Sequence, residues 1–186
     1  FGTVHILVNN AGIPVPEPGT SAFDMRYFAE SDPRGWGRTM DVITAGVMNV
    51  THAVLPHMVA QRYGKVVSIV SDAGVVGEPH MVAYSMAKAG VVGFTRALAK
   101  EAGRHRINVN CVSPGSTPAN APVAEELTGD DARRQLARFR QYPMAQGYER
   151  MGVPSDVADP VVFLCSDRAV WITGALVRAS GGYSIS

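Results

Sequence analysis

The sequence contains little of what marks several special classes of protein. Only two cysteines occur, Cys111 and Cys165, and they form neither a metal-site spacing nor a disulfide framework, so two buried thiols in a reducing compartment are expected. The 17 Lys and Arg residues balance 16 Asp and Glu residues, and the net charge of +1 argues against nucleic acid or an anionic membrane as a partner. The five histidines include no pair at ligand spacing, so no metal is expected.

Long apolar runs and targeting segments are absent as well. No apolar run is long enough to span a bilayer and no signal peptide is visible, so a cytoplasmic protein is expected. The 186 residues are enough for one domain with a proper core, and the 46% hydrophobic share is that of an ordinary soluble globular protein. No repeat, low-complexity tract or second domain is visible, so residues 1–186 are expected to form a single domain.

What the sequence does contain is an alternation of strand-like and helix-like segments. Strands are predicted at residues 4–9, 65–70, 106–112 and 175–179, and the first is an almost continuous apolar run typical of a buried parallel strand. Helices are predicted from Pro33 towards Tyr63, from Tyr84 to near Gly103, and over 155–167, with Asp32 as the N-cap of the first. This βαβ alternation predicts an α/β fold with a parallel sheet.

Tyr84 and Lys88 lie at the start of the second of these helices. Residues four apart share one face of a helix, so the phenol and the ammonium point the same way. A phenol normally ionises near pH ~10, and a fixed cation beside it lowers that pKa, which makes a general acid/base from a tyrosine. Taken alone, a Tyr–Lys pair at this spacing is more often an exposed pair without a function.

Ser71 changes that balance. It lies thirteen residues before Tyr84, at the carboxyl end of the apolar run over 65–70. Open α/β sheets bind their ligands at the carboxyl ends of the strands. A hydroxyl there and a phenol at the start of the next helix are therefore expected to converge on one carbonyl group.

These residues resemble the short-chain dehydrogenase/reductase family. Ser71, Tyr84 and Lys88 look like its catalytic Ser, Tyr and Lys, and four further signatures, the last of them the two-part tail, match in order over nearly the whole chain. They are Asn9-Asn10-Ala11-Gly12, Ser113-Pro114-Gly115, the run from Arg150 to Ala158, Ile172-Thr173-Gly174, and Gly181-Gly182. The resemblance implies an α/β fold, namely the C-terminal two-thirds of a doubly wound (Rossmann-type) parallel sheet flanked by helices.

The resemblance also implies an activity, a cofactor and partners. It implies an oxidoreductase that transfers a hydride between NAD or NADP and a secondary alcohol or ketone, with hydroxyacyl-CoA, cyclic alcohols or 3-oxoacyl-carrier-protein as candidate substrates. A substrate lid is expected at about 119–150, and the long helix is expected to form a homo-dimer or homo-tetramer contact. The residues implied to bind the cofactor are Asn9, Ala11, Gly12, Tyr84, Lys88, Pro114, Gly115 and Thr117.

Two departures from the family pattern keep an alternative open. No glycine-rich phosphate loop is present, so the sequence looks like the C-terminal part of a longer enzyme and the choice between NAD and NADP stays open. Ile43 stands where the family has a fourth catalytic residue, an Asn. The alternative is a non-catalytic fragment or pseudoenzyme that retains the oligomerising half of the fold.

Overall fold

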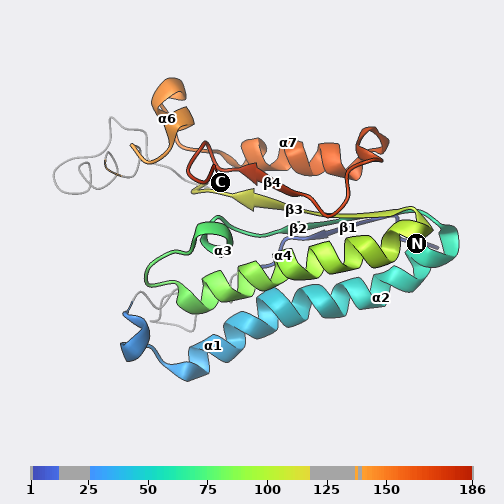
Figure 1. Cartoon of the computed structure of the whole chain (residues 1–186), viewed down its shortest axis with the longest axis horizontal. Coiled ribbons are helices and arrows are strands. Elements are labelled where there is room, and N and C mark those ends of the chain that lie inside the picture. The colour runs from blue at the N-terminus through green and yellow to red at the C-terminus, as the bar shows by residue number, and fades with distance from the viewer. Residues whose placement is uncertain (1, 13–25, 118–136, 138–139, 186) are drawn as a thin grey trace.

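Four parallel strands form the centre of the protein. The computed structural model describes residues 2–12, 26–117, 137 and 140–185, and within them the strands form one sheet in the order β1-β2-β3-β4, as the alternation predicted. The strands are β1 (Ile6–Asn9), β2 (Gly64–Ile69), β3 (Ile107–Pro114) and β4 (Leu176–Ala179). Because all four run the same way, their carboxyl ends meet at one edge of the sheet (Figure 1).

Helices cover both faces of this sheet. The long helix α2 (Gly46–Gln61) and α4 (Val82–Ala102) lie side by side on one face, and α7 (Pro154–Cys165) lies on the other (Figure 1). Shorter elements are η1 (Phe28–Glu30), α1 (Pro33–Met40), α3 (Ala73–Val76), η3 (Gly103–His105), α6 (Pro143–Tyr148) and η5 (Asp167–Ala169). The described part is therefore a three-layer α/β arrangement, the Rossmann-type architecture expected from the sequence.

The two central strands build the core because both of their faces are buried. Val66 and Val109 pack with Met58 and Leu98 under the α2–α4 layer. Val67, Val112 and Leu164 pack together under α7. This explains the largely apolar run of β2, since a parallel strand covered on both faces has no solvated side. β3 alternates instead, and its buried Asn108 and Asn110 both donate to the Ile172 carbonyl.

The long first helix differs in detail from its prediction. Asp32 is its N-cap, as expected, and accepts a hydrogen bond from the Arg34 N–H at 2.9 Å. Between α1 and α2 lies a π-helical turn, η2 (Asp41–Ala45), where the Gly46 N–H donates to the Asp41 carbonyl. Single π turns inside helices are rare and occur often at functional sites, and this one carries Ile43.

By length and composition alone, the combined helix could also cross a membrane. It runs over 29 residues from Pro33 to Gln61, and an 18-residue stretch of it has a mean hydropathy of 1.3. By this measure the prediction that no segment could span a bilayer is wrong. Val47, Thr51 and Met58 nevertheless bury one side of α2 within the fold. The apolar character of this helix is therefore used at least in part for packing.

Strand β1 is more exposed than its sequence predicted. Ile6 is 48% exposed and Val8 is 41% exposed, although the apolar run was expected to be buried. Within the described residues β1 pairs with β2 alone and lies at the edge of the sheet, so α7 does not reach it. The lid expected at about 119–150 falls largely outside the described residues.

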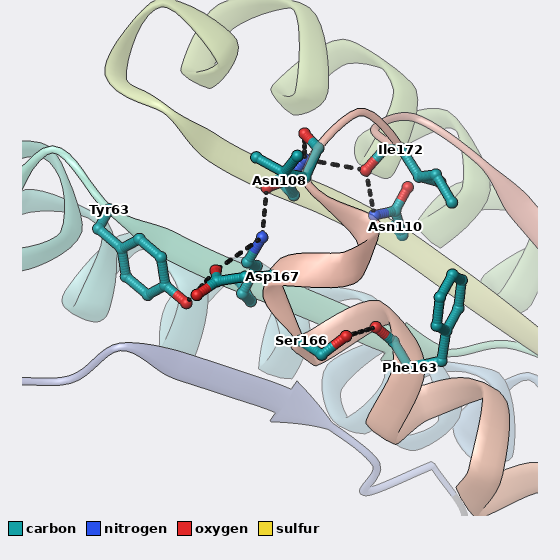
Figure 2. A network of polar contacts seen from close by, with 9 residues as sticks. Tyr63, Asn108, Asn110, Phe163, Ser166, Asp167 and Ile172 are labelled. Carbon is teal, nitrogen blue, oxygen red and sulfur yellow. Dashed lines mark hydrogen bonds and ion pairs between the residues drawn. The ribbon is translucent and has the colours of Figure 1, made fainter.

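A polar network ties the amino-terminal edge of the sheet together, opposite the candidate site. The buried Lys65 ammonium donates to Asn108 Oδ1 at 2.9 Å and lies 3.8 Å from Asp167 Oδ1. Asn108 in turn donates to the carbonyls of Val170 and Ile172, and the Tyr63 hydroxyl donates to Asp167 at 2.9 Å (Figure 2). This network fixes the chain between α7 and β4 against β2 and β3.

Candidate active site

Ser71 lies where the sequence predicted it, just beyond the carboxyl end of β2. The chain leaves the strand at Ile69 and turns into the short helix α3, where Ser71 Oγ accepts a hydrogen bond from the Ala73 N–H at 3.3 Å. The next residue, Asp72, is buried and accepts from Ser113 Oγ at 2.6 Å. Ser71 is thus held between two strand ends.

Tyr84 lies in the first turn of α4 and makes a hydrogen bond with Ser71. Two residues thirteen positions apart in the sequence are therefore joined directly. Burial raises the pKa of Tyr84 above its ordinary value, and the hydrogen bond with Ser71 lowers it by less. From the sequence, Lys88 was expected to lower the pKa of Tyr84. In the structure that pKa is raised instead, because burial of the phenol outweighs the other influences.

Lys88 lies one turn further along α4 and is almost completely buried, with 4% of its surface exposed. Its Nζ donates to the Ile69 carbonyl at 2.7 Å and lies 5.7 Å from the centre of the Tyr84 ring. Burial lowers the pKa of Lys88 to about 8. The ammonium is therefore aimed at the strand end that leads to Ser71, and not into solvent.

Tight packing of α3 on α4 holds Lys88 in place. A Cβ added at Gly74 would lie 2.7 Å from Cβ of Lys88 and 2.8 Å from the backbone of Ala89. No side chain fits at this position, so Gly74 is required for the close approach. The segment that carries Ser71 is thereby pressed against the helix that carries Tyr84 and Lys88.

The Asn9–Gly12 segment follows β1 and reaches Lys88. The Asn9 side chain is buried and donates to Thr51 Oγ1 and Ser68 Oγ, each at 3.2 Å, so its amide fastens β1 to α2 and β2. Ala11 is exposed. A Cβ added at Gly12 would lie 2.7 Å from Lys88 Nζ, which places the backbone of this segment directly beside the ammonium.

The turn after β3 lies at the same edge of the sheet. Pro114 ends the strand, and the Gly115 N–H donates to the Ala179 carbonyl at 3.3 Å. A Cβ at Gly115 would lie 2.8 Å from the ring of Tyr142, so a side chain is excluded there. Thr117 lies against Gly152, further from the Tyr84–Lys88 pair along the turn.

Ile43 offers no polar group to the site. It is 1% exposed and lies in a core cluster with Val47, Val70 and Ala87, against which Tyr84 also packs. An isoleucine has neither a hydrogen-bond donor nor an acceptor. In the family pattern an Asn stands at this position, next to the catalytic candidates. In this chain the position is apolar.

Glu78, Tyr142 and Tyr183 lie near the site but were not predicted as site residues from the sequence. Tyr183 donates to Glu78 at 2.9 Å, and its ring stacks on Tyr142. Glu78 and Tyr183 are 105 residues apart, and no local spacing predicts a contact over that distance.

Within the part of the chain that the structure describes, no group of three His, Cys, Asp or Glu residues is placed to hold a metal ion.

Comparisons with known proteins identify the family of this chain. A sequence model of the family described as enoyl-(acyl carrier protein) reductase matches residues 1–184. A relative from Thauera aromatica, (2S)-[(R)-hydroxy(phenyl)methyl]succinyl-CoA dehydrogenase subunit BbsD, is 39% identical over all of this chain and 67% of its own length. The 3-oxoacyl-[acyl-carrier-protein] reductase FabG of Thermotoga maritima is 35% identical over all of this chain and 68% of its own length.

The chain belongs to the short-chain dehydrogenase/reductase family of oxidoreductases. It spans about two thirds of the length of those relatives. A further relative, from Xanthobacter autotrophicus, is 38% identical over 98% of this chain and 74% of its own length, and is named inactive 2-(S)-hydroxypropyl-CoM dehydrogenase 2. Active and inactive proteins therefore both occur among its relatives.

Proposed function

We propose that this protein is part of an enzyme that transfers a hydride between a nicotinamide cofactor and a secondary alcohol or ketone. The observation that carries the proposal is the hydrogen bond between Ser71 and Tyr84 at the carboxyl edge of the sheet, with the buried Lys88 one turn away on the same helix. A hydroxyl, a phenol and a cation at one point suit proton transfer to or from a substrate oxygen.

Each of the three residues has a distinct role in the proposal. Ser71 donates a hydrogen bond to the substrate oxygen and stabilises the negative charge that develops on it. Tyr84 moves the proton at that oxygen. Lys88 favours the ionised phenol during the transfer, although burial dominates the pKa of Tyr84 in the structure described here.

The residues around Lys88 fit a nicotinamide cofactor. An ammonium has three donors, and within the described residues the Ile69 carbonyl is the acceptor for one of them, so buried donor capacity remains beside the bare backbone of Gly12. When bound, such a cofactor supplies or accepts the hydride. The residues proposed to hold it are Asn9, Ala11, Gly12, Tyr84, Lys88, Pro114, Gly115 and Thr117, and both NAD and NADP are candidates.

For the substrate we propose an acyl thioester that carries a hydroxyl or keto group. The names of two relatives, a hydroxyacyl-CoA-type dehydrogenase and a 3-oxoacyl-carrier-protein reductase, support this class. Cyclic alcohols are the second class to test, because substrate preference varies widely within one fold.

The test is an assay of the full natural protein with acetoacetyl-CoA and with cyclohexanone, each with NADH and with NADPH. Oxidation of the cofactor that depends on a ketone, and that Tyr84→Phe abolishes, is the expected result. Absence of any ketone-dependent oxidation, in a protein that is folded by circular dichroism, would reject the proposed activity.

A second candidate function is a non-catalytic protein of the same fold. Ile43 supports it, because the chain has no polar group where the family pattern has an Asn, and a relative named inactive shows that catalysis is dispensable in some proteins of this kind. Thermal-shift titration with NADH separates the two. A stabilised protein favours the enzyme, and an unresponsive folded protein favours the alternative.

For the partner we propose a second copy of this chain. Apolar side chains remain exposed on neighbouring helices of one face, with Met48 and Val50 on α2 and Met86 on α4, the last 63% exposed. Such an apolar helix face supports a homo-oligomeric contact. Light scattering coupled to size-exclusion chromatography measures the mass of the full natural protein, and a drop in that mass for Met86→Lys is the expected result.

A further inference from the structure

The C-terminal tail turns back over the carboxyl edge of the sheet. Gly181 and Gly182 both have positive φ, at +59° and +86°, and a Cβ at Gly182 would lie 3.1 Å from the ring of Pro143. The Met144 N–H donates to the Gly181 carbonyl at 3.0 Å. Because glycine adopts this backbone without strain, the pair directs Tyr183 back towards the candidate site.

Tyr183 reaches the loop that joins the two proposed catalytic residues. Its hydroxyl donates to Glu78 Oε2 at 2.9 Å, and Glu78 lies between Ser71 and Tyr84 in the sequence. The Glu78 N–H in turn donates to Ser85 Oγ at 3.3 Å, next to Tyr84. Burial and the hydrogen bond to Glu78 raise the pKa of Tyr183 to about 12, so its hydroxyl stays protonated and remains a donor at neutral pH.

The other side of Tyr183 contacts the opposite wall of the site. Its ring stacks on Tyr142 at 5.0 Å between ring centres and 17° between ring planes. The Tyr142 hydroxyl accepts from the Ser116 N–H at 3.1 Å, in the turn that follows Gly115. One tail residue is therefore connected to the Glu78 loop through its hydroxyl and to the turn after β3 through its ring.

We propose that Tyr183 is a positioning residue for the substrate, because it holds the Glu78 loop at a fixed distance from the turn after β3. The inference rests on the proposed function, which puts the reacting carbonyl between Ser71 and Tyr84. Those two residues are held by their own hydrogen bond and by α4, so loss of the Tyr183 hydroxyl leaves them in place. It releases the loop that borders them, and the substrate site loses its shape.

The experiment compares Tyr183→Phe with Tyr63→Phe in the full natural protein. Both changes remove a tyrosine hydroxyl that donates to a carboxylate at 2.9 Å, but Tyr63 does so at the opposite edge of the sheet (Figure 2). For Tyr183→Phe the KM for acetoacetyl-CoA is expected to rise roughly tenfold, the size of effect that one hydrogen bond to a charged group gives. The kcat and the KM for the cofactor should change less than about twofold, and Tyr63→Phe should leave all three constants unchanged.

Glu78 variants and hydrogen exchange give a second, independent reading. Glu78→Ala should reproduce the rise in KM. Glu78→Gln keeps an acceptor and should largely retain the natural KM. The double variant Tyr183→Phe/Glu78→Ala should have the same KM as either single variant. Amides of residues 77–82 should exchange faster in Tyr183→Phe than in Tyr63→Phe. This last measurement needs no activity.

The outcomes separate this inference from the proposed function. An unchanged KM, or unchanged exchange over 77–82, in Tyr183→Phe overturns the positioning role while the activity stands. Faster exchange in a folded protein that reduces no ketone rejects the proposed function, and with it the role of Tyr183 towards the substrate. A kcat that falls as far as the KM rises would also overturn it, because the hydroxyl would then act on the reacting groups themselves.

Discussion

Tyr84 is partly buried beside the buried Lys88, and burial shifts the pKa values of the two residues in opposite directions. It raises the pKa of the phenol and lowers that of the ammonium to about 8, so it disfavours the charged form of both. The hydrogen bond with Ser71 is the influence that favours the ionised phenol. The Tyr84 phenol is therefore protonated at neutral pH in the structure described here.

This arrangement predicts the effect of removing the phenol. Tyr84→Phe deletes the hydroxyl that moves the proton but keeps the ring that packs against the Ile43 cluster. Turnover should fall at least ~10²–10⁴-fold, as for other general acid/base groups, and cofactor affinity should change little. Lys88→Met should weaken cofactor binding as well as turnover. Steady-state kinetics and fluorescence titration of the cofactor measure both, and a Tyr84→Phe protein with more than about a tenth of natural turnover would remove Tyr84 from the mechanism.

Ile43 predicts a second effect, on the route by which the proton leaves. In the family that this chain resembles, the Asn at this position helps hold a water that links the Lys to solvent, and Ile43 cannot bind one. Ile43→Asn should therefore raise kcat with little change in cofactor Kd, and a solvent-deuterium effect on kcat should shrink. Ile43→Val keeps the position apolar and serves as the control. An unchanged or lower kcat in a stable Ile43→Asn protein would mean that the chain uses a different proton route.

Asp156 gives a prediction about pH. It accepts two hydrogen bonds from Arg150, at 2.7 and 3.0 Å, and one from the Val153 N–H at 2.9 Å, at the start of α7. The hydrogen bonds from Arg150, and to a lesser extent the one from Val153, lower the pKa of Asp156 from 3.8 to about 2. Because the folded pKa is below the unfolded one, the stabilisation is present above about pH 4 and is lost as the pH falls through about 2.

The melting temperature measures this contribution. Asp156→Asn should melt lower than the natural protein near neutral pH, and the difference should narrow as the pH falls from about 4 to about 2. Both residues of the pair are more than a third exposed, so the difference should be small and should shrink in high salt. Asp159→Asn, an exposed change on the same helix, is the control. A difference in melting temperature that does not change with pH would show that the ionisation of Asp156 does not stabilise the fold.

Among the elements, those with a clear period or boundary signal were predicted well. The Asp32–Pro33 start of the first helix and the strands β2 and β3 are confirmed to within one or two residues, because capping, apolar runs and period-two alternation are local signals. Ser71 and Tyr84 could be singled out because they stand at a strand end and a helix start. The π turn at Ile43 could not be predicted, since single π turns are rare and neither a cap nor a period in the sequence marks this one.

Long-range polar contacts were out of reach for the same reason. Asn9 was predicted as a cofactor-binding residue, and the hydrogen bonds of its side-chain amide to Thr51 and Ser68 were not predicted. Tyr183 was visible only as part of a family-like tail, although it is bonded to Glu78. Each of these contacts joins segments more than forty residues apart, and the spacing of residues within a segment carries no information about them.

The polar network at the amino-terminal edge of the sheet predicts how strongly the stability of the fold depends on the Asn108 side chain. Lys65 is buried with its ammonium on Asn108, so Asn108→Ala leaves a buried cation with fewer partners. It also removes the side-chain bond to the Val170 carbonyl, whereas the Ile172 carbonyl keeps its bond from Asn110. The free energy of unfolding should fall by about 2–4 kcal/mol in urea denaturation. Adding Lys65→Met to Asn108→Ala should recover part of that loss, because no unpaired ammonium remains. Additive losses in the double variant would show that the two residues do not interact.

Within the described residues, the outer strands β1 and β4 are each paired on one side only, and β1 is the more exposed, open edge. At the β4 side, the tail and α6 lie over the end of the sheet, and Gly115, Tyr142 and Tyr183 interlock there. At the other side β1 has a paired neighbour in β2 alone among the described residues. Leu7 faces the α2–α4 layer, whereas Ile6 and Val8 are in register with Lys65 and Val67 and face the α7 side.

This open edge predicts how the 186-residue chain behaves by itself. Ile6 and Val8 expose apolar surface beside an unpaired strand edge, and such an edge readily pairs with another chain. The isolated chain should therefore be insoluble or should associate through β1, in a concentration-dependent way that sedimentation velocity detects.

A charge placed on either apolar surface tells the two modes of association apart. Val8→Lys puts a charge on β1 and should reduce association through the edge, while Met86→Lys changes the exposed face of α4 and should leave that association in place. If Met86→Lys alone abolishes it, the chains meet through their helices, and the open edge of β1 is not the cause. A natural chain that stays monodisperse and monomeric, with ordinary two-state unfolding, would show that β1 is stable as an edge strand and that its exposed valine and isoleucine need no further cover.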